Sequence, residues 1–372
     1  LIANPVYVLG MVVFPILVTV LFTSLMDEGQ PEEMPVGVVD LDNTSFTRKL
    51  TRSLDAFQTT HIVARYPNVE EARKAMQQGT IYAFLYYPKG TTDALLSSRQ
   101  PTISFYYSYT SLTAGSLLFR DLKTISTLGS AAVGSATLKA KGLTDAQIGT
   151  FLQPIKIDLH TVANPWVNYN VYLSTMLVPG CLLLFVFLIT AYAFGMELKQ
   201  NTSRQLIKIA GGKCWVAIAG KVLPHLLVHL AIFSLYLLYI YKVLHFPHEG
   251  GVGVIALLAV LSVMGSMGFA IFMFGLFPSL RMSMSMCSLW GVLSYSMVGT
   301  AFPTFAMDAP LEVLSNLFPL RHYFRIYQTC VFNGNALIYD WANILALVVF
   351  ALLPLLVARS IRKAYSTYVY LP

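Results

Sequence analysis

Residues Val171 to Met196 read VYLSTMLVPGCLLLFVFLITAYAFGM, and this stretch decides the fold. It contains no Asp, Glu, Lys or Arg, and it exceeds the roughly 20 apolar residues that a helix needs to cross a bilayer. Polar residues follow at once in Glu197 to Leu206, and three more lysines precede the next apolar run. Five basic residues and one acid beside a span predict a cytoplasmic loop over residues 197–221.

The composition of the whole chain is that of a membrane protein. It has 372 residues, of which 56% are hydrophobic and 12% charged. This differs strongly from the average for soluble proteins. The net charge of +7 comes from loops beside apolar runs, so it favours a topology signal over a nucleic-acid surface. The four cysteines show neither a CxxC pair nor a metal-binding spacing.

Six apolar runs are long enough to be membrane spans. The first, at residues 1–26, is too long for the apolar core of a signal peptide, and we expect a cytoplasmic piece to precede it. Together with Val171 to Met196, the predicted spans are Val6 to Met26, Val222 to Tyr241, Val252 to Phe277, Met282 to Met307 and Trp341 to Ala358.

Basic residues in the short loops predict the orientation. Nine fall on one side, namely Lys199, Arg204, Lys208, Lys213, Lys221, Arg281, Arg359, Arg362 and Lys363. Lys242, Arg321 and Arg325 fall on the other, so both termini are expected in the cytoplasm. In the membrane region, residues 171–363, the segment 303–340 is too apolar for a solvated loop. We expect it to be re-entrant, with residues 364–372 as a tail.

Residues 27–170 differ from the rest, with 13 basic and 13 acidic residues. Helices are expected after a cap within Asn43 to Ser45, after Asn68 with Glu71 in a capping box, and over Leu112 to Lys139. We interpret the region as an extracytoplasmic α+β domain inserted between the first two spans. It has two histidines and no cysteine, so we expect no catalysis there. The predicted strands are Pro35 to Leu41, His61 to Tyr66, Ile81 to Tyr87, Thr102 to Tyr107 and Ile155 to Thr161.

Three motifs are weaker than they first look. Gly211-Gly-Lys213 lacks the upstream glycine and the Ser/Thr of a phosphate-binding loop, so no ATP site is predicted. Asp40-Leu-Asp42 lacks the later glycine and acid of a calcium loop, which favours a strand end and helix cap. His225 and His229 lie one turn apart and could bind a metal or relay protons. Since no third ligand is apparent, polar packing against a neighbouring helix is favoured.

The predicted spans contain no acidic residue, which argues against a carrier driven by protons or sodium. The fifth predicted span carries Ser283, Cys287 and Gly291 at four-residue spacing, between methionines. Small residues at this spacing allow close helix packing, whereas methionines make an adaptable apolar surface. The sequence leaves both interpretations open.

Short motifs connect the chain to one family. Glu197, Thr202, Gln205 and Leu206 fit the pattern E-x-E-x-G-T-x-x-Q-L, in which Asn201 replaces the glycine and Lys199 the second acid. On these residues the chain resembles the permease subunits of bacterial type-2 ATP-binding-cassette (ABC) exporters, in the subgroup with a large extracytoplasmic domain between the first two spans. Further matches are Gly220-Lys-Val-Leu-Pro224, Gly299-Thr-Ala-Phe-Pro303, Met307-Asp-Ala-Pro310 and Phe318-Pro-Leu-Arg-His-Tyr323.

The resemblance implies a transport subunit of the bacterial inner membrane that is not itself an enzyme. Its expected partners are ABC ATPase subunits that bind ATP and Mg, a second permease, identical or paralogous, membrane lipids and a periplasmic adaptor protein. The domain at residues 27–170 is expected to be a docking and exit element, and a lid that only shields the exit is the equal alternative to docking. The expected cargo is a drug-like or lipid-like molecule, hydrophobic or amphipathic. An ion-coupled carrier and a membrane-anchored sensor or scaffold are the alternatives.

The resemblance also assigns residues. The expected ATPase-coupling set is Glu197, Asn201, Thr202, Gln205 and Leu206. The expected export path, along the second and fifth spans at a dimer interface, comprises Met176, Phe185, Met286, Ser294 and Met297. From the residues alone, Asn201 or Thr202 caps a short amphipathic helix, which could fit a groove on a partner or lie on the membrane surface.

Overall fold

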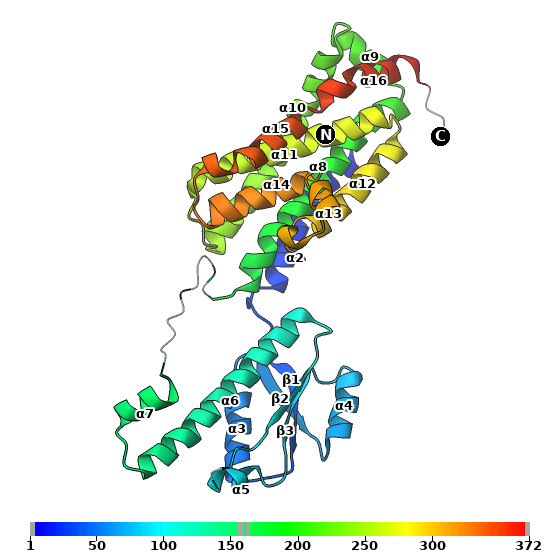
Figure 1. Cartoon of the computed structure of the whole chain (residues 1–372). Coiled ribbons are helices and arrows are strands. Elements are labelled where there is room, and N and C mark those ends of the chain that lie inside the picture. Colours follow the sequence, from blue (N-terminus) through cyan, green and yellow to red (C-terminus); the bar gives the residue numbers. More distant parts are fainter. Residues whose placement is uncertain (1–3, 98, 155–159, 161–163, 165, 369–372) are drawn as a thin grey trace. The chain divides into compact units, whose positions relative to one another are not determined.

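The structure is a computed structural model that describes residues 4–97, 99–154, 160, 164 and 166–368 (Figure 1). The chain divides into two compact units. One comprises Leu1–Gly29 and Thr161–Pro372, and the other comprises Gln30–His160. We call them the helical unit and the sheet unit, and each is described by itself.

The helical unit is built almost entirely from helices. Its longest are α8 (Tyr169–Lys199), α10 (Cys214–Leu238), α11 (Gly251–Leu276) and α12 (Leu280–Met297). The others are α1 (Pro5–Val8), η1 (Leu9–Val13), α2 (Phe14–Leu25), α9 (Ser203–Ile209), η2 (Tyr239–Val243), η3 (Thr304–Ala306), α13 (Ala309–Ser315), α14 (Pro319–Ile326), η4 (Tyr327–Phe332), η5 (Leu337–Asp340), α15 (Trp341–Leu352) and α16 (Pro354–Thr367).

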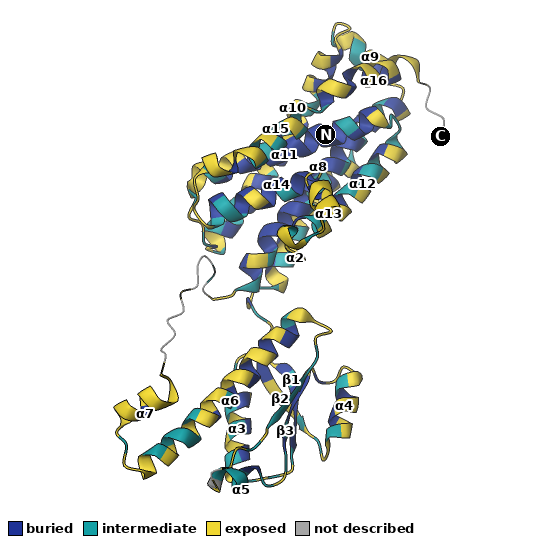
Figure 2. Cartoon of the chain, in the orientation of Figure 1, coloured by how far each residue is buried: buried dark blue, intermediate teal, exposed yellow. Residues whose placement is uncertain are grey.

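Five helical stretches among the described residues are long and apolar enough to span a membrane. They are Pro5–Leu25, Tyr169–Lys199, Cys214–Val243, Gly251–Leu276 and Leu337–Thr367. They confirm an α-helical membrane protein and five of the six predicted spans. Figure 2 shows that α8 and α11 are largely buried, whereas α2, α10 and α15 expose broad apolar surface.

The C-terminal end of the remaining predicted span, Met282 to Met307, was predicted wrongly. Its helix α12 stops at Met297, ten residues early, and Gly299 then has a φ of 102°. A left-handed backbone followed by Pro303 ends the helix. α12 also contains Arg281 and several serines, so it falls outside the set of five apolar stretches.

Long-range contacts show that the helices run back and forth between two ends of the unit. At one end, which we call the Glu197 end, Asn4 Nδ2 donates to the Tyr192 hydroxyl at 3.2 Å, Ser360 Oγ donates to the Gly275 carbonyl at 2.6 Å, and Gly195 lies against Leu280. At the opposite end, the Asn170 end, α2 meets α8 where Asn170 Nδ2 donates to the Thr23 carbonyl at 2.9 Å. There Thr23 Oγ1 also donates to the Tyr239 hydroxyl, and the Tyr172 hydroxyl donates to the Thr300 carbonyl.

Helix α12 runs antiparallel to α8 along most of its length. Leu280 lies against Gly195, Gly291 lies against Leu184, and Tyr295 lies against Gly180. A Cβ at Gly180 would lie 2.6 Å from the Tyr295 ring, which is too close for any larger residue. Ser283, Cys287 and Gly291 are all buried, so this stripe is a helix-packing surface.

The segment from 303 to 340 contains the short helices η3, α13, α14, η4 and η5. α14 and η4 lie inside the bundle, where Leu320, Tyr323 and Phe324 join its largest apolar cluster. By contrast, η3 and α13 expose Phe305 (86%) and Val313 (70%).

The sheet unit has a four-stranded sheet in the order β2-β1-β3-β4, parallel except for the β3–β4 pair. Its strands are β1 (Met34–Asp40), β2 (Thr60–Arg65), β3 (Ala83–Tyr87) and β4 (Ser104–Tyr107). Its helices are α3 (Ser45–Asp55), α4 (Val69–Gln77), α5 (Thr91–Leu96), α6 (Leu112–Ala140) and α7 (Asp145–Leu152). The strand predicted at Ile155 to Thr161 lies outside the described residues.

Helices cover both faces of this sheet. Leu54 of α3 and Leu118 of α6 pack with Val36 and Val38 on one face, whereas Ala72 of α4 packs with Val39 on the other. The inner face of α6 carries Leu118, Leu122 and Ile125 and continues to Gly129. Ala132 and Ala136 are exposed because α6 extends beyond the apolar cluster.

Candidate functional site

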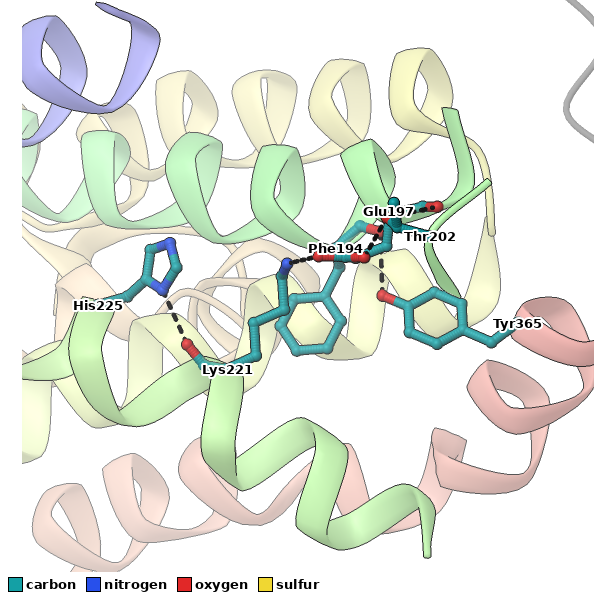
Figure 3. Close-up of polar contacts among 6 residues, drawn as sticks. All are labelled: Phe194, Glu197, Thr202, Lys221, His225 and Tyr365. Carbon is teal, nitrogen blue, oxygen red and sulfur yellow. Dashed lines mark hydrogen bonds and ion pairs between the residues drawn. The ribbon is translucent and has the colours of Figure 1, made fainter. Parts of the chain in front are cut away.

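A polar corner forms where α8 ends and α10 begins (Figure 3). Lys221 Nζ forms an ion pair with Glu197 Oε1, and Thr202 Oγ1 donates to Glu197 Oε2. The side chains of Glu197 and Lys221 are only 19% and 13% exposed. A largely buried carboxylate needs hydrogen-bond or ion-pair partners for its oxygens, and here both oxygens have one. The corner is therefore a fixed part of the fold and not an exposed ion pair on the surface.

The turn between α8 and α9 explains the departure from the family pattern. Asn201 has a left-handed backbone with a φ of 57°, at the place where that pattern has glycine. Asparagine is among the few other residues that tolerate this conformation. The Thr202 amide then donates to the Glu197 carbonyl at 3.0 Å. The turn therefore keeps its shape despite the substitution.

Helix α9 is fixed to the C-terminal helix α16. Ser203 Oγ donates to the Tyr365 carbonyl at 3.1 Å, and the Tyr365 hydroxyl donates to the Phe194 carbonyl at 3.0 Å. Leu206 and Ile207 pack against the apolar cluster of Phe194, Ile361 and Tyr365. α9 therefore lies against the protein with its inner face covered.

The outer face of α9 is free in the part of the chain that the structure describes. Asn201 and Gln205 are exposed, and Ile209 is 85% exposed. We call Ile209, together with the exposed basic residues Lys199, Arg204, Lys208 and Lys213, the α9 surface. Sequence reasoning assigned Leu206 to the contact and missed Ile209. Helical spacing gives no clear signal for its direction, because Ile209 lies two residues after Ile207 but three residues after Leu206.

The structure thus unites part of the predicted coupling set. Glu197 and Thr202 form the corner, Asn201 shapes the turn, and Gln205 lies on the outer face. Leu206 instead packs inward.

The two histidines of α10 make no metal site with other described residues, since no group of three or more His, Cys, Asp or Glu could hold an ion. His225 Nδ1 donates to the Lys221 carbonyl at 2.8 Å. Its ring also packs edge to face on Tyr7, with the ring centres 5.3 Å apart. Among the described residues, neither His225 Nε2 nor His229 Nε2 has a hydrogen-bond partner, so the contact with the neighbouring helix is aromatic rather than the expected polar packing.

The residues predicted for the export path do not gather in one place. Met176 lies in the largest apolar cluster, whereas Met286 packs against a different one. Phe185 stacks on Phe14 of α2, and Ser294 is buried with its hydroxyl on the Gly291 carbonyl. Met297 is half-buried. The exposed face of α12 consists of other residues, namely Arg281 at its start, then Met282, Ser285, Leu289, Val292, Leu293 and Ser296.

Comparison with known proteins identifies the family. Residues 6–359 match the family described as ABC-2 family transporter protein. The match covers nearly the whole chain, so the protein belongs to this family. No curated protein matches the chain.

Membership defines the class of molecule. The chain is a multi-pass membrane protein and the permease subunit of an ABC transporter. Such permeases are membrane subunits without an ATP site of their own, and they work with an ABC ATPase subunit.

Proposed function

We propose that this permease exports a hydrophobic or amphipathic small molecule, drug-like or lipid-like, from the cytoplasm or the inner leaflet of a bacterial inner membrane. An ATPase subunit would drive it from the Glu197 end. The supporting observation is the polar corner, which holds α9 rigidly while Ile209 and the surrounding basic residues stay exposed. A rigid element with a free apolar tip suits a groove on a partner.

This proposal places the Glu197 end in the cytoplasm. Asn4 and Tyr365 both lie at that end, so both ends of the described chain share it. Since α12 leads from Leu280 at this end toward Tyr295 near the other, α12 would supply the sixth crossing. The predicted majority of basic residues then falls on the cytoplasmic side. The sheet unit, inserted between the first two crossings, would be extracytoplasmic.

We further propose that two permeases meet along α8 and the exposed face of α12. Leu289, Val292 and Leu293 are 53%, 56% and 41% exposed, and together they form an apolar stripe. An apolar surface without charge accepts varied hydrophobic molecules, because it demands no matched hydrogen bonds. The export path would run beside this stripe, with the sheet unit as its exit and as a docking element for a periplasmic adaptor protein.

Substitution of Ile209 tests the coupling assignment. Ile209→Asp should leave the fold intact, because the side chain is exposed, yet abolish stimulation of the ATPase subunit by the permease. The measurement is ATP hydrolysis by the complex in proteoliposomes, together with efflux of a lipophilic dye such as Nile red.

Ile209→Leu is the matched control and should retain both activities. If Ile209→Asp supports normal hydrolysis and efflux, α9 does not couple to the ATPase.

A further inference from the structure

A chain of hydrogen bonds runs through buried side chains between α13 and α15. His322 of α14 and Asp340 of η5 are 4% and 7% exposed. His322 Nε2 lies 2.9 Å from the carbonyl oxygen of Asn316, and Nδ1 lies 2.8 Å from Asn343 Oδ1. Asn343 Nδ2 in turn donates to Asp340 Oδ1 at 2.8 Å. Both ring nitrogens of the histidine are therefore engaged.

The partners determine how many hydrogens the ring carries. A backbone carbonyl oxygen only accepts, so His322 Nε2 must bear a hydrogen. An ionised carboxylate also only accepts, so Asn343 turns its NH₂ group toward Asp340 and its oxygen toward the ring. Nδ1 must then bear a hydrogen as well. A ring with both hydrogens is the charged imidazolium.

Reversing the Asn343 amide does not change the number of protons. Its oxygen would then face Asp340, which would have to be protonated in order to donate, while His322 would be neutral. Either arrangement contains one proton more than an ionised aspartate with a neutral histidine. Asp340 Oδ2 also accepts from Thr329 Oγ1, which suits the ionised form and places the extra proton on His322.

Charged residues of both signs lie on the elements next to the ring. Asp340 on η5 and Glu312 on α13 are acidic, while Arg321 and Arg325 lie on the same helix as His322. Arg321 is occupied, since its Nη1 donates to the Glu312 carbonyl at 2.8 Å. His322 likewise donates to a carbonyl at the C-terminal end of α13, where cations are favoured.

We propose that His322, Asn343 and Asp340 form a proton-binding site that fastens the segment 316–343. While the extra proton is bound, one continuous chain of hydrogen bonds joins α13, α14, η5 and α15. Loss of that proton leaves two acceptors facing each other in a buried place, which costs a hydrogen bond and weakens the fastening. The segment is therefore held tightly at low pH and loosens as the pH rises.

Nitrogen-15 NMR of the histidines, recorded on the full-length protein in lipid at pH 6, tests the protonation directly. His322 should show both ring nitrogens bonded to hydrogen, and that signal should be missing in His322→Gln. If the variant does not fold, substitution of the six other histidines assigns the signal by elimination. A His322 ring with one protonated nitrogen, next to an ionised Asp340 by infrared spectroscopy, overturns the proposal.

Hydrogen exchange between pH 5 and 9 tests the consequence. Beyond the intrinsic effect of pH, exchange in residues 316–343 should rise by about tenfold, the equivalent of one lost hydrogen bond. His248→Gln, at an exposed histidine, should keep this dependence. Asp340→Asn should abolish it, because an amide at this position can donate to Asn343 and so complete the chain without the extra proton. A dependence unchanged in Asp340→Asn contradicts the proposal.

Discussion

At the scale of single residues, the structural role of Glu197 depends on a partner that is distant in the sequence. The sequence marks it as the acid that ends a span, and from this alone Glu197→Ala with Leu206→Asp should leave folding intact. The structure shows instead that Glu197 pairs with Lys221 and that Leu206 packs inward. Neither contact follows from local periodicity, because both depend on how helices meet.

We therefore expect Glu197→Ala to destabilise the protein by about 2–3 kcal/mol, since it leaves Lys221 charged, mostly buried and unpaired. Replacing both residues in Glu197→Ala/Lys221→Met removes that charge and should restore most of the loss. Chemical denaturation of the four proteins of this double-mutant cycle in detergent is the measurement. Equal losses in the single and double variants would exclude the ion pair as the cause.

Asp42 predicts a pH dependence in the sheet unit. Burial alone would raise the pKa of this carboxyl, but hydrogen bonds from Thr92, Thr44 and Gly90 outweigh it and hold the pKa below its ordinary value of 3.8. The motif is a strand end and a helix cap, as expected, because β1 ends at Asp40 and Thr44 caps α3. Asp42 itself accepts from the amides at the start of α5. Because the folded state lowers the pKa, the stabilisation is present above about pH 4 and is lost as the pH falls further.

Hydrogen exchange at the amides of Gly90 and Thr92 should accordingly speed up in acid relative to the rest of the unit. In Asp42→Asn that extra acid sensitivity should be absent. Its persistence in the variant would assign it to another group.

At the scale of elements, helix packing explains what the hydrophobic pattern could and could not predict. Charge-free runs located α8 well, because the predicted span is Val171 to Met196 and the observed helix is Tyr169–Lys199. They misplaced the end of α12, because the apolar run continues past Gly299 although the backbone turns there. The small residues of α12 were correctly identified as a stripe, but only the structure shows that α8 covers it.

Gly291→Val should weaken the α8–α12 contact, because its side chain would overlap Leu184. Overpacking of this kind costs about 1–3 kcal/mol. Gly253→Val in α11 is the control, since a Cβ there meets nothing within 4 Å. The thermal unfolding midpoint should fall clearly in the first variant and little in the second. Equal midpoints would show that the two helices do not pack this closely.

At the scale of the whole molecule, the membrane class, five of the spans and the family could be predicted from the sequence, because they rest on long apolar runs and a local motif. The α9 surface could not. Its free residue Ile209 differs from Leu206 only in the direction it faces, which is set by the docking of α9 on α16. The His322 chain was also beyond prediction, because it joins residues up to 27 positions apart, from Asn316 to Asn343.

The central claim is that the α9 surface contacts the ATPase subunit. Single cysteines at Ile209 and at Phe305 test it, since these side chains are 85% and 86% exposed and lie on α9 and in the segment 303–340 respectively. With a short thiol-reactive cross-linker in native membranes, Ile209→Cys should form a covalent adduct with the ATPase subunit, and Phe305→Cys should not. An adduct from Phe305→Cys alone, or equal adducts from both positions, would contradict the account.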